Sequence, residues 1–251
     1  MKKDTLIVIP ARYASTRFPA KVLKPLAGKP VLQWVYEACV KADVGTVLVA
    51  TEHKAVVEAA AKFDAAAILT STSCASGTDR IFQASRGRKE KYIVNVQSDE
   101  PFLEAATLRA VLKKLYASRE TDIATACARI KDRHEISDPN CVKMAMNKDG
   151  RALYFSRSPI PYHHELSPDF KTAPWFKHCG LYAYKRAALE KFVKLPPSPL
   201  ERLERLEQLR ALEAGMLISC VEVPRLGPAI DVPSDIAKSM AYLKKLRSKR
   251  A

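Results

Sequence analysis

The first half of the chain alternates continuous apolar runs with stretches of helical periodicity. Apolar runs of this kind, which suit strands buried on both faces of a parallel sheet, occupy residues 5–10, 46–51, 65–70 and 92–97. Helical patterns occupy residues 29–42, 52–63 and 77–88, and another follows at about 104–117. This order predicts an α/β, doubly wound fold with a mainly parallel central sheet and helices on both faces.

The pattern changes after the last of these helices. Strand-like segments with little helix between them cover residues 122–130, 141–147, 151–156 and 178–185. A loop at 157–176 carries four prolines and resembles a lid or an interaction arm. No linker is visible, so we expect one domain over residues 1–251, with a subordinate β-rich insertion around 125–185.

Leucines recur every third residue in the segment that follows residue 197. They stand at Leu200, Leu203, Leu206, Leu209 and Leu212. Three residues of α-helix turn about 300°, so each leucine lies roughly 60° behind the previous one. The apolar face therefore sweeps around the helix, which predicts a single helix that is largely enclosed or contacts two different surfaces.

Composition limits the classes of partner. Lys and Arg number 42 against 27 Asp and Glu, a net charge of +15 that favours an anionic partner. Nucleic-acid binding rests on this charge alone, because the basic residues are scattered and no recognition module is visible. The six cysteines form no C-x-x-C motif, which argues against zinc. No run approaches the length of a membrane span, and we expect a soluble, cytoplasmic protein with reduced thiols.

The loop after the first apolar run, PARYASTRFPAK at 10–21, carries three cations and no glycine. These cations are Arg12, Arg17 and Lys21. Cationic side chains can hold phosphates as glycine amides do, and neither a G-x-G-x-x-G nor a P-loop motif is present. The stretch alone is equally compatible with a solvated surface loop.

Two acidic loops are the other candidates for chemistry. Asp99 follows the apolar run 92–97, and Asp231 lies between Ile230 and a proline. A carboxylate at the end of a buried strand is costly unless it is paired or binds a cation, and hard oxygen ligands suit Mg²⁺. Helix capping is the alternative for both residues, although Asp235 could supply the second cap and leave Asp231 for a metal.

Several ordered motifs together resemble the 3-deoxy-manno-octulosonate (KDO) cytidylyltransferase, or CMP-KDO synthetase, family. They are IPARYASTRFPAK, SGTDR (76–80), VNVQSDEP (94–101), ALYFSRSPIP (152–161), HCGLYAY (178–184), PPSPLERLERLEQLR (196–210) and IDVPSD (230–235). The resemblance implies a Rossmann-like nucleotidyltransferase fold and transfer of CMP from CTP to the anomeric hydroxyl of KDO, releasing pyrophosphate, for lipopolysaccharide biosynthesis. It also implies a homodimer, no nucleic-acid or membrane partner, and a role of the 125–185 lobe in sugar binding and dimerisation.

The resemblance also implies roles for individual residues. Arg12, Arg17 and Lys21 would neutralise the triphosphate, and Asp99 and Asp231 would hold Mg²⁺. These five residues form the predicted catalytic set. Ser76 and Gly77 would lie against the nucleotide. The residues expected to line the sugar pocket are Gln97, Arg157, His178, Tyr182, Glu207 and Gln208. Arg157 is the candidate partner of the sugar carboxylate.

Two positions depart from the family pattern. Ala20 and Ser98 stand where the family usually has glycine, a residue used where φ is positive or where backbone approaches a ligand. Ser98 lies beside Asp99, so it bears on the identity of the sugar. The alternative function is therefore transfer of CMP to a related 2-keto-3-deoxy sugar acid, such as an 8-amino analogue of KDO.

Overall fold

The computed structural model describes residues 2–14, 18–164 and 175–248 of the chain, and these residues form two compact units. Unit 1 comprises Met1–Arg109 and Gly227–Ala251, and unit 2 comprises Ala110–Leu226. The predicted single domain with a lobe at 125–185 stays a prediction. None of the described helices is both long and apolar enough to cross a lipid bilayer.

Unit 1 is built on four parallel strands. These are β1 (Thr5–Pro10), β4 (Thr46–Thr51), β5 (Ala67–Leu69) and β6 (Tyr92–Val96), in the order β6-β1-β4-β5. Every residue of β1 is buried, as expected for the central strand of a sheet covered on both faces. All four strands coincide with the predicted apolar runs, and their carboxyl ends share one edge.

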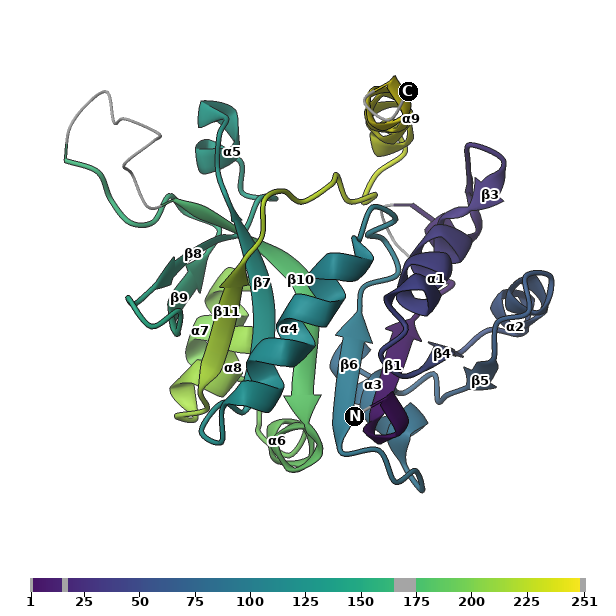
Figure 1. Ribbon diagram of the computed structural model, residues 1–251, viewed down its shortest axis with the longest axis horizontal. Helices are drawn as coiled ribbons and strands as arrows, with labels where there is room; N and C mark the ends of the chain where they lie inside the picture. Colours follow the sequence, from purple (N-terminus) through teal and green to yellow (C-terminus); the bar gives the residue numbers. More distant parts are fainter. Residues whose placement is uncertain (1, 15–17, 165–174, 249–251) are drawn as a thin grey trace. The chain divides into compact units, whose positions relative to one another are not determined.

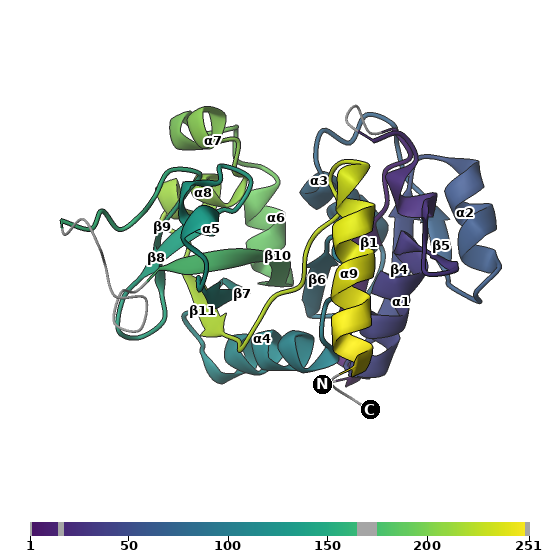
Figure 2. The same cartoon turned by 90° about the horizontal axis from the view of Figure 1, so that it is seen from above.

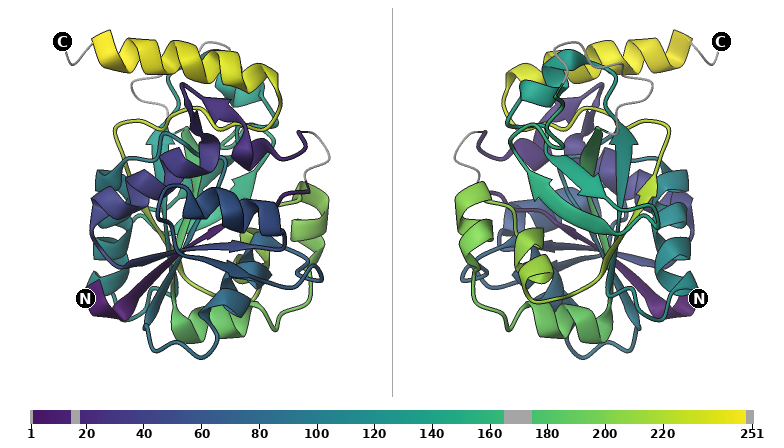
Figure 3. Two further views of the ribbon diagram at one scale, coloured as in Figure 1. Left: turned by 90° about the vertical axis from the view of Figure 1, so that its right-hand side faces the viewer. Right: turned by 90° about the vertical axis from the view of Figure 1, so that its left-hand side faces the viewer.

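Helices cover both faces of these strands. The connecting helices are α1 (Val31–Ala42), α2 (Lys54–Ala61) and α3 (Gly77–Ser85), and α1 and α3 lie on opposite faces (Figures 2 and 3). A further helix, α4 (Ala105–Ala117), begins in unit 1 and ends in unit 2. The doubly wound α/β architecture expected from the alternating pattern is therefore confirmed.

The C-terminal helix packs over the N-terminal part of unit 1. Helix α9 (Ser234–Ser248) contacts a small hairpin of β2 (Pro25–Leu26) and β3 (Lys29–Pro30), as the left view of Figure 3 shows. The shared core consists of Phe18, Leu26, Val31, Ile230 and Leu243. This core brings residues near 20 and residues near 231, which are far apart in the sequence, to one place.

Unit 2 contains the strand-rich part of the chain (Figure 1). Its strands are β7 (Ile123–Arg129), β8 (Lys143–Met146), β9 (Ala152–Ser156), β10 (Phe176–Lys185) and β11 (Ile218–Glu222). Strand β10 is antiparallel to β7 and β8, and β11 is parallel to β7. The short helices of unit 2 are α5 (Arg133–Ser137), α6 (Arg186–Phe192), α7 (Pro199–Glu204) and α8 (Gln208–Glu213). Unit 1 contains two short 3₁₀ helices, η1 (Lys2–Asp4) and η2 (Lys21–Leu23).

The prediction of one enclosed leucine helix is wrong. Ser198 forms a capping box that starts α7, and Arg205 adopts a left-handed conformation that ends it before α8 begins. Leu203 is 81% exposed, whereas Leu209 is fully buried. The break between α7 and α8 explains how leucines spaced every three residues can be accommodated. Each short helix needs to bury only its own narrow apolar face.

Candidate active site

Lys21 lies between the two predicted metal-binding aspartates. Its Nζ is 2.6 Å from Oδ2 of Asp99 and 3.2 Å from Oδ1 of Asp231. Lys21 begins η2, Asp99 follows β6, and Asp231 precedes α9. The amide of Ile230 donates to the carbonyl of Asp99 at 2.9 Å, which ties the two acidic loops together. The structure thus brings together three of the five residues of the predicted catalytic set.

The electrostatics of Lys21 favour its charged form. Burial by itself would lower the pKa of this ammonium, but the charges and hydrogen bonds of Asp99 and then Asp231 outweigh burial. The pKa of Lys21 is therefore raised above its ordinary value. Both aspartates share one small cation in this state, so the site is built to hold concentrated positive charge.

Asp235 fulfils the structural role that was the alternative for Asp231. Its Oδ2 accepts hydrogen bonds from the amides of Asp231 and Val232, at 2.9 and 3.1 Å. These bonds, with a smaller contribution from Lys238, lower the pKa of Asp235 although burial opposes the shift. Because Asp235 stabilises the turn before α9, the carboxylate of Asp231 is directed to Lys21 and is available to a cation.

The donor chemistry of the pair fits a magnesium ion. Mg²⁺ in nucleotide enzymes is held by one or two carboxylates, completed by substrate phosphates and water. Among the described residues, no group of three or more His, Cys, Asp or Glu side chains could hold a metal by itself. Asp99 and Asp231 would hold such an ion together with substrate phosphates.

The residue before Lys21 is strained. Ala20 has φ 52° and ψ 30°, in the left-handed region, and its amide donates to the carbonyl of Tyr13 at 3.0 Å. A Cβ in this conformation costs about 1–2 kcal/mol, which glycine avoids. The departure from the family's glycine thus falls at a position where positive φ is needed.

Ala20→Gly is accordingly expected to stabilise the protein. The gain should be about 0.5–1 kcal/mol, because relief of strain exceeds the extra entropy of glycine in the unfolded chain. Urea unfolding followed by circular dichroism would measure it. As a control, Ala84→Gly, inside α3, should instead cost stability; equal losses at both positions would contradict the strain argument.

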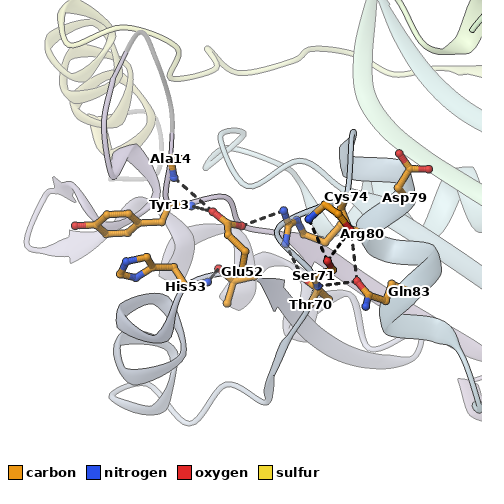
Figure 4. A network of polar contacts seen from close by, with 12 residues as sticks. Tyr13, Ala14, Glu52, His53, Thr70, Ser71, Cys74, Asp79, Arg80 and Gln83 are labelled. Atoms are coloured by element: carbon orange, nitrogen blue, oxygen red, sulfur yellow. Dashed lines mark hydrogen bonds and ion pairs between the residues drawn. The ribbon is translucent and has the colours of Figure 1, made fainter.

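The described start of the basic loop is anchored by Glu52, which follows β4 (Figure 4). Oε1 of Glu52 accepts hydrogen bonds from the amides of Tyr13 at 2.8 Å and Ala14 at 3.5 Å. The ring of Tyr13 stacks on His53, with centroids 3.9 Å apart. Arg12 is exposed at the end of β1, and Arg17 lies outside the described residues, so its predicted contact with phosphate stays a prediction.

Glu52 is held in turn by a buried arginine from the SGTDR motif. Nη2 of Arg80 lies 3.0 Å from Oε2 of Glu52, and Nη1 donates to Oγ1 of Thr70 at 2.5 Å. The side chain of Arg80 is 1% exposed and that of Glu52 is 12% exposed. Figure 4 shows Glu52 between the basic loop and Arg80. The pair therefore connects the ends of β4 and β5 to the loop that follows β1.

The two predicted nucleotide contacts lie at the start of α3. Ser76 caps this helix, accepting from the amide of Asp79, while Asp79 accepts from the amide of Ser76. A Cβ added to Gly77 would lie 3.5 Å from Cγ of Pro10 at the end of β1. Ser76 and Gly77 thus lie beside the start of the basic loop, and their contact with a nucleotide stays a prediction.

Most of the predicted sugar-pocket residues lie in unit 2, and Gln97 lies in unit 1. Arg157 uses Nε and Nη1 to donate to the carbonyls of Glu204 and Pro139, each at 2.8 Å. Its amide also donates to the Glu204 carboxylate at 2.8 Å. Arg157 is therefore fixed by the protein itself, and a sugar carboxylate would have to use its remaining N–H groups.

Glu207 and Gln208 stand at the start of α8. Glu207 precedes the helix, and Gln208 is its first residue and is only 7% exposed. The segment is held by the ion pair of Arg210 with Glu201, a bidentate contact at 2.5 and 2.7 Å. This ion pair links α7 to α8, the helix that Gln208 begins.

His178 on β10 is enclosed by aromatic rings and by a buried threonine. Its ring lies 5.0 Å from that of Phe155 and 5.2 Å from that of Tyr182. Its Nε2 lies 2.9 Å from Oγ1 of Thr125, which is fully buried. Burial lowers the pKa of His178 to about 3, so the imidazole is neutral at ordinary pH.

This low pKa predicts that stability falls in acid. Between the ordinary pKa of 6.5 and the folded value of about 3, the unfolded state binds the proton and the native state does not. The free energy of unfolding should therefore decrease by at most about 1.4 kcal/mol per pH unit below pH 6. Urea unfolding at pH 6, 5 and 4 would show this slope, and His178→Gln should flatten it; identical slopes would mean that His178 titrates normally.

Sequence reasoning missed Glu52, Arg80 and Thr125. The rule that singled out Asp99, a carboxylate directly after a buried strand, applies equally to Glu52 and could have found it. Arg80 stands inside a recognised motif, and an arginine opposite a strand-end acid was a usable signal. Thr125 carries no such signal, because a threonine inside a strand is ordinary.

Doubly wound sheets bind ligands beyond the carboxyl ends of their strands, which is where Lys21 and Asp99 lie. Together with the matches that follow, this makes the protein a nucleotidyltransferase. Residues 6–218 match the family model described as Cytidylyltransferase, and the chain belongs to that family. A relative from Elusimicrobium minutum, named 3-deoxy-manno-octulosonate cytidylyltransferase, is 51% identical over 96% of this chain and 98% of its own length. One from Synechococcus elongatus with the same name is 45% identical, over 94% and 97%.

Solved structures agree with this family. One of CMP:2-keto-3-deoxy-manno-octonic acid synthetase complexed with CTP has a TM-score of 0.89 and 38% identity, over 97% of this chain and 99% of the other. A 4-diphosphocytidyl-2C-methyl-D-erythritol synthase from Anaerococcus prevotii has a TM-score of 0.64 at 12% identity, over 97% of this chain and 100% of the other, which shows a shared fold alone.

Proposed function

We propose that this enzyme transfers CMP from CTP to the anomeric hydroxyl of 3-deoxy-manno-octulosonate and releases pyrophosphate. The observation that carries the proposal is the near-full-length similarity to relatives of that name, at 51% and 45% identity. The cluster of Lys21, Asp99 and Asp231 supports it, because a cation and two carboxylates at strand ends suit a triphosphate.

The residues of the cluster have complementary roles in this reaction. Charge grows on the departing pyrophosphate, so a fixed ammonium such as that of Lys21 stabilises the transition state more than the ground state. Asp99 and Asp231 would hold Mg²⁺, which would supply Lewis-acid assistance and in-line orientation of the attacking hydroxyl. No side-chain nucleophile is needed, since the sugar hydroxyl attacks phosphorus directly.

Lys21 pairs with both carboxylates, and on nucleotide binding it would exchange these partners for the phosphates. The backbone bond from Ile230 to Asp99 keeps the two acidic loops together during this exchange. The Glu52–Arg80 pair fixes the amide of Tyr13, so that the neighbouring Arg12 would be held near the strand ends before the nucleotide arrives.

Several finer points of the proposal follow from the family resemblance. We propose Mg²⁺ as the metal, a homodimer as the assembly and a cytoplasmic location, with the product serving lipopolysaccharide synthesis. Ser98 is 7% exposed and lies beside Asp99, at a position where the family usually has glycine. For this reason a related 2-keto-3-deoxy sugar acid is the alternative substrate.

An assay of pyrophosphate release tests the proposal. The protein is incubated with CTP, Mg²⁺ and either 3-deoxy-manno-octulosonate, its 8-amino analogue or no sugar, with UTP in place of CTP as the nucleotide control. Release that requires both CTP and 3-deoxy-manno-octulosonate is expected, and EDTA should abolish it. Faster release with the 8-amino analogue would favour the alternative, and no sugar-dependent release by folded protein would refute both.

A further inference from the structure

A bulge in β10 turns two backbone carbonyls toward one threonine of β7. The register between these strands shifts between Cys179, opposite Ala126, and Tyr182, opposite Thr125. At this point Oγ1 of Thr125 lies 3.2 Å from the carbonyl oxygen of Cys179 and 2.7 Å from that of Leu181. Bulges of this kind re-aim side chains next to functional sites.

The same hydroxyl also contacts His178, so Thr125 has three hydrogen-bond neighbours and one proton to donate. Two of these neighbours are carbonyl oxygens, which only accept. An oxygen–oxygen distance of 2.7 Å without a proton between the atoms would be repulsive, so the hydroxyl donates to the backbone. The third contact, at 2.9 Å to Nε2 of His178, must then be donated by the imidazole.

We propose that Thr125 is a positioning residue that holds His178 as the Nε2-protonated tautomer, so that Nδ1 accepts a hydrogen bond from a hydroxyl group of the sugar acid. Phe155 and Tyr182 fix the plane of the ring, and the hydroxyl of Thr125 fixes which nitrogen carries the proton. The assignment of the ligand to the sugar acid rests on the proposed function.

A neutral imidazole with an unprotonated Nδ1 determines which kind of substrate group His178 can bind. The lone pair of Nδ1 attracts an O–H donor and repels a carboxylate, so His178 does not bind the acid group of the substrate. Burial of the ring keeps it uncharged and reinforces this preference. The structure thereby separates recognition of a sugar hydroxyl from recognition of the sugar carboxylate.

The tautomer can be observed directly in the full-length protein without any assay of activity. The imidazole nitrogens are labelled with ¹⁵N, and the signals of His178 are assigned as those absent from the His178→Gln variant. The expected spectrum has the proton on Nε2 and an unprotonated Nδ1. A proton on Nδ1 in the wild-type protein would overturn the proposal.

Two substitutions of Thr125 test its role in substrate binding. Thr125→Ser keeps the hydroxyl and should retain the tautomer and the kinetics, whereas Thr125→Val removes the hydroxyl and should populate the other tautomer. The loss of one hydrogen bond should raise the KM for 3-deoxy-manno-octulosonate about tenfold, with the KM for CTP unchanged. Equal changes in both KM values, or none, would contradict a positioning role.

A matched control separates this effect from a general loss of a buried hydroxyl. Thr121 is also buried in unit 2, and its Oγ1 lies 2.8 Å from Oγ of Ser219. Thr121→Val should leave both the His178 tautomer and the sugar KM unchanged; a rise equal to that of Thr125→Val would refute the specific role. If the wild-type protein shows the expected tautomer but no turnover with any sugar acid, the proposed function fails and the tautomer assignment stands.

Discussion

Replacing Asp99 with asparagine is expected to lower kcat about 10²–10³-fold, because the neutral amide loses the negative charge that a metal and the attacking hydroxyl depend on. The fold should survive. Asp99 is the nearer partner of Lys21, but Oδ1 of Asp231 also lies 3.2 Å from Nζ of Lys21. Because the ammonium keeps this second partner, we expect a loss of only about 1–2 kcal/mol in the free energy of unfolding. Steady-state kinetics with CTP and the sugar acid, beside urea unfolding of the same variant, measure the two effects separately.

A double-mutant cycle with Lys21→Met distinguishes the two roles open to Asp99. If Asp99 only orients Lys21, the two single variants should have equal defects and the double variant should be no worse. If it binds the metal, Asp99→Asn should also raise the Mg²⁺ concentration for half-maximal activity, by about 10–100-fold, whereas Lys21→Met should not. A variant that kept kcat within tenfold of the wild type would remove Asp99 from the mechanism.

The parallel sheet of unit 1 was predictable because its strands are buried on both faces. Such strands must be apolar along their whole length, and the runs at 5–10, 46–51 and 92–97 became β1, β4 and β6 almost to the residue. The topology followed from the alternation with helices, which permits few arrangements. Strand β11 was missed because Ser219 interrupts its apolar residues, so that the segment ISCVE is no continuous apolar run.

The cluster at Lys21 was predictable in part. The placement of Asp99 near the basic loop follows from the rule that the carboxyl ends of parallel strands share one edge. Asp231 follows no strand of this sheet, and the core that Ile230 and Leu243 share with Phe18 brings it there. The ion pairs of Lys21 to both acids do not follow from this rule, because side-chain partners depend on the packing of α9, which is more than 200 residues away in the chain.

Unit 2 shows why periodicity alone misjudged the leucine segment. A three-residue spacing fits a continuous helix poorly, and the left-handed conformation of Arg205 ends α7 between Leu203 and Leu206. The Thr125–His178 contact joins residues 53 positions apart across a bulge, which no local pattern encodes. Sequence therefore predicts the sheet better than it predicts the contacts that tune the site.

Arg80→Met is expected to cause the largest loss of stability among the substitutions considered, about 3–5 kcal/mol. The methionine fills much of the space of the arginine but leaves the carboxylate of Glu52 in a site where it is only 12% exposed, without its cation. Glu52 also holds the amides of Tyr13 and Ala14, so the basic loop should loosen and the KM for CTP should rise. Urea unfolding and CTP kinetics measure the two consequences.

A surface pair of the same residue types supplies the control. Arg151 and Glu120 form an ion pair at 2.5 Å, and their side chains are 43% and 67% exposed, so Arg151→Met should cost less than about 1 kcal/mol. Adding Glu52→Gln to Arg80→Met should recover part of the lost stability, because it removes the uncompensated buried charge. It should not restore the KM for CTP, since an amide oxygen accepts more weakly from the loop than a carboxylate does. If Arg80→Met were no more costly than Arg151→Met, the Glu52–Arg80 pair would not anchor the loop, and the preorganisation of the basic loop would need another source.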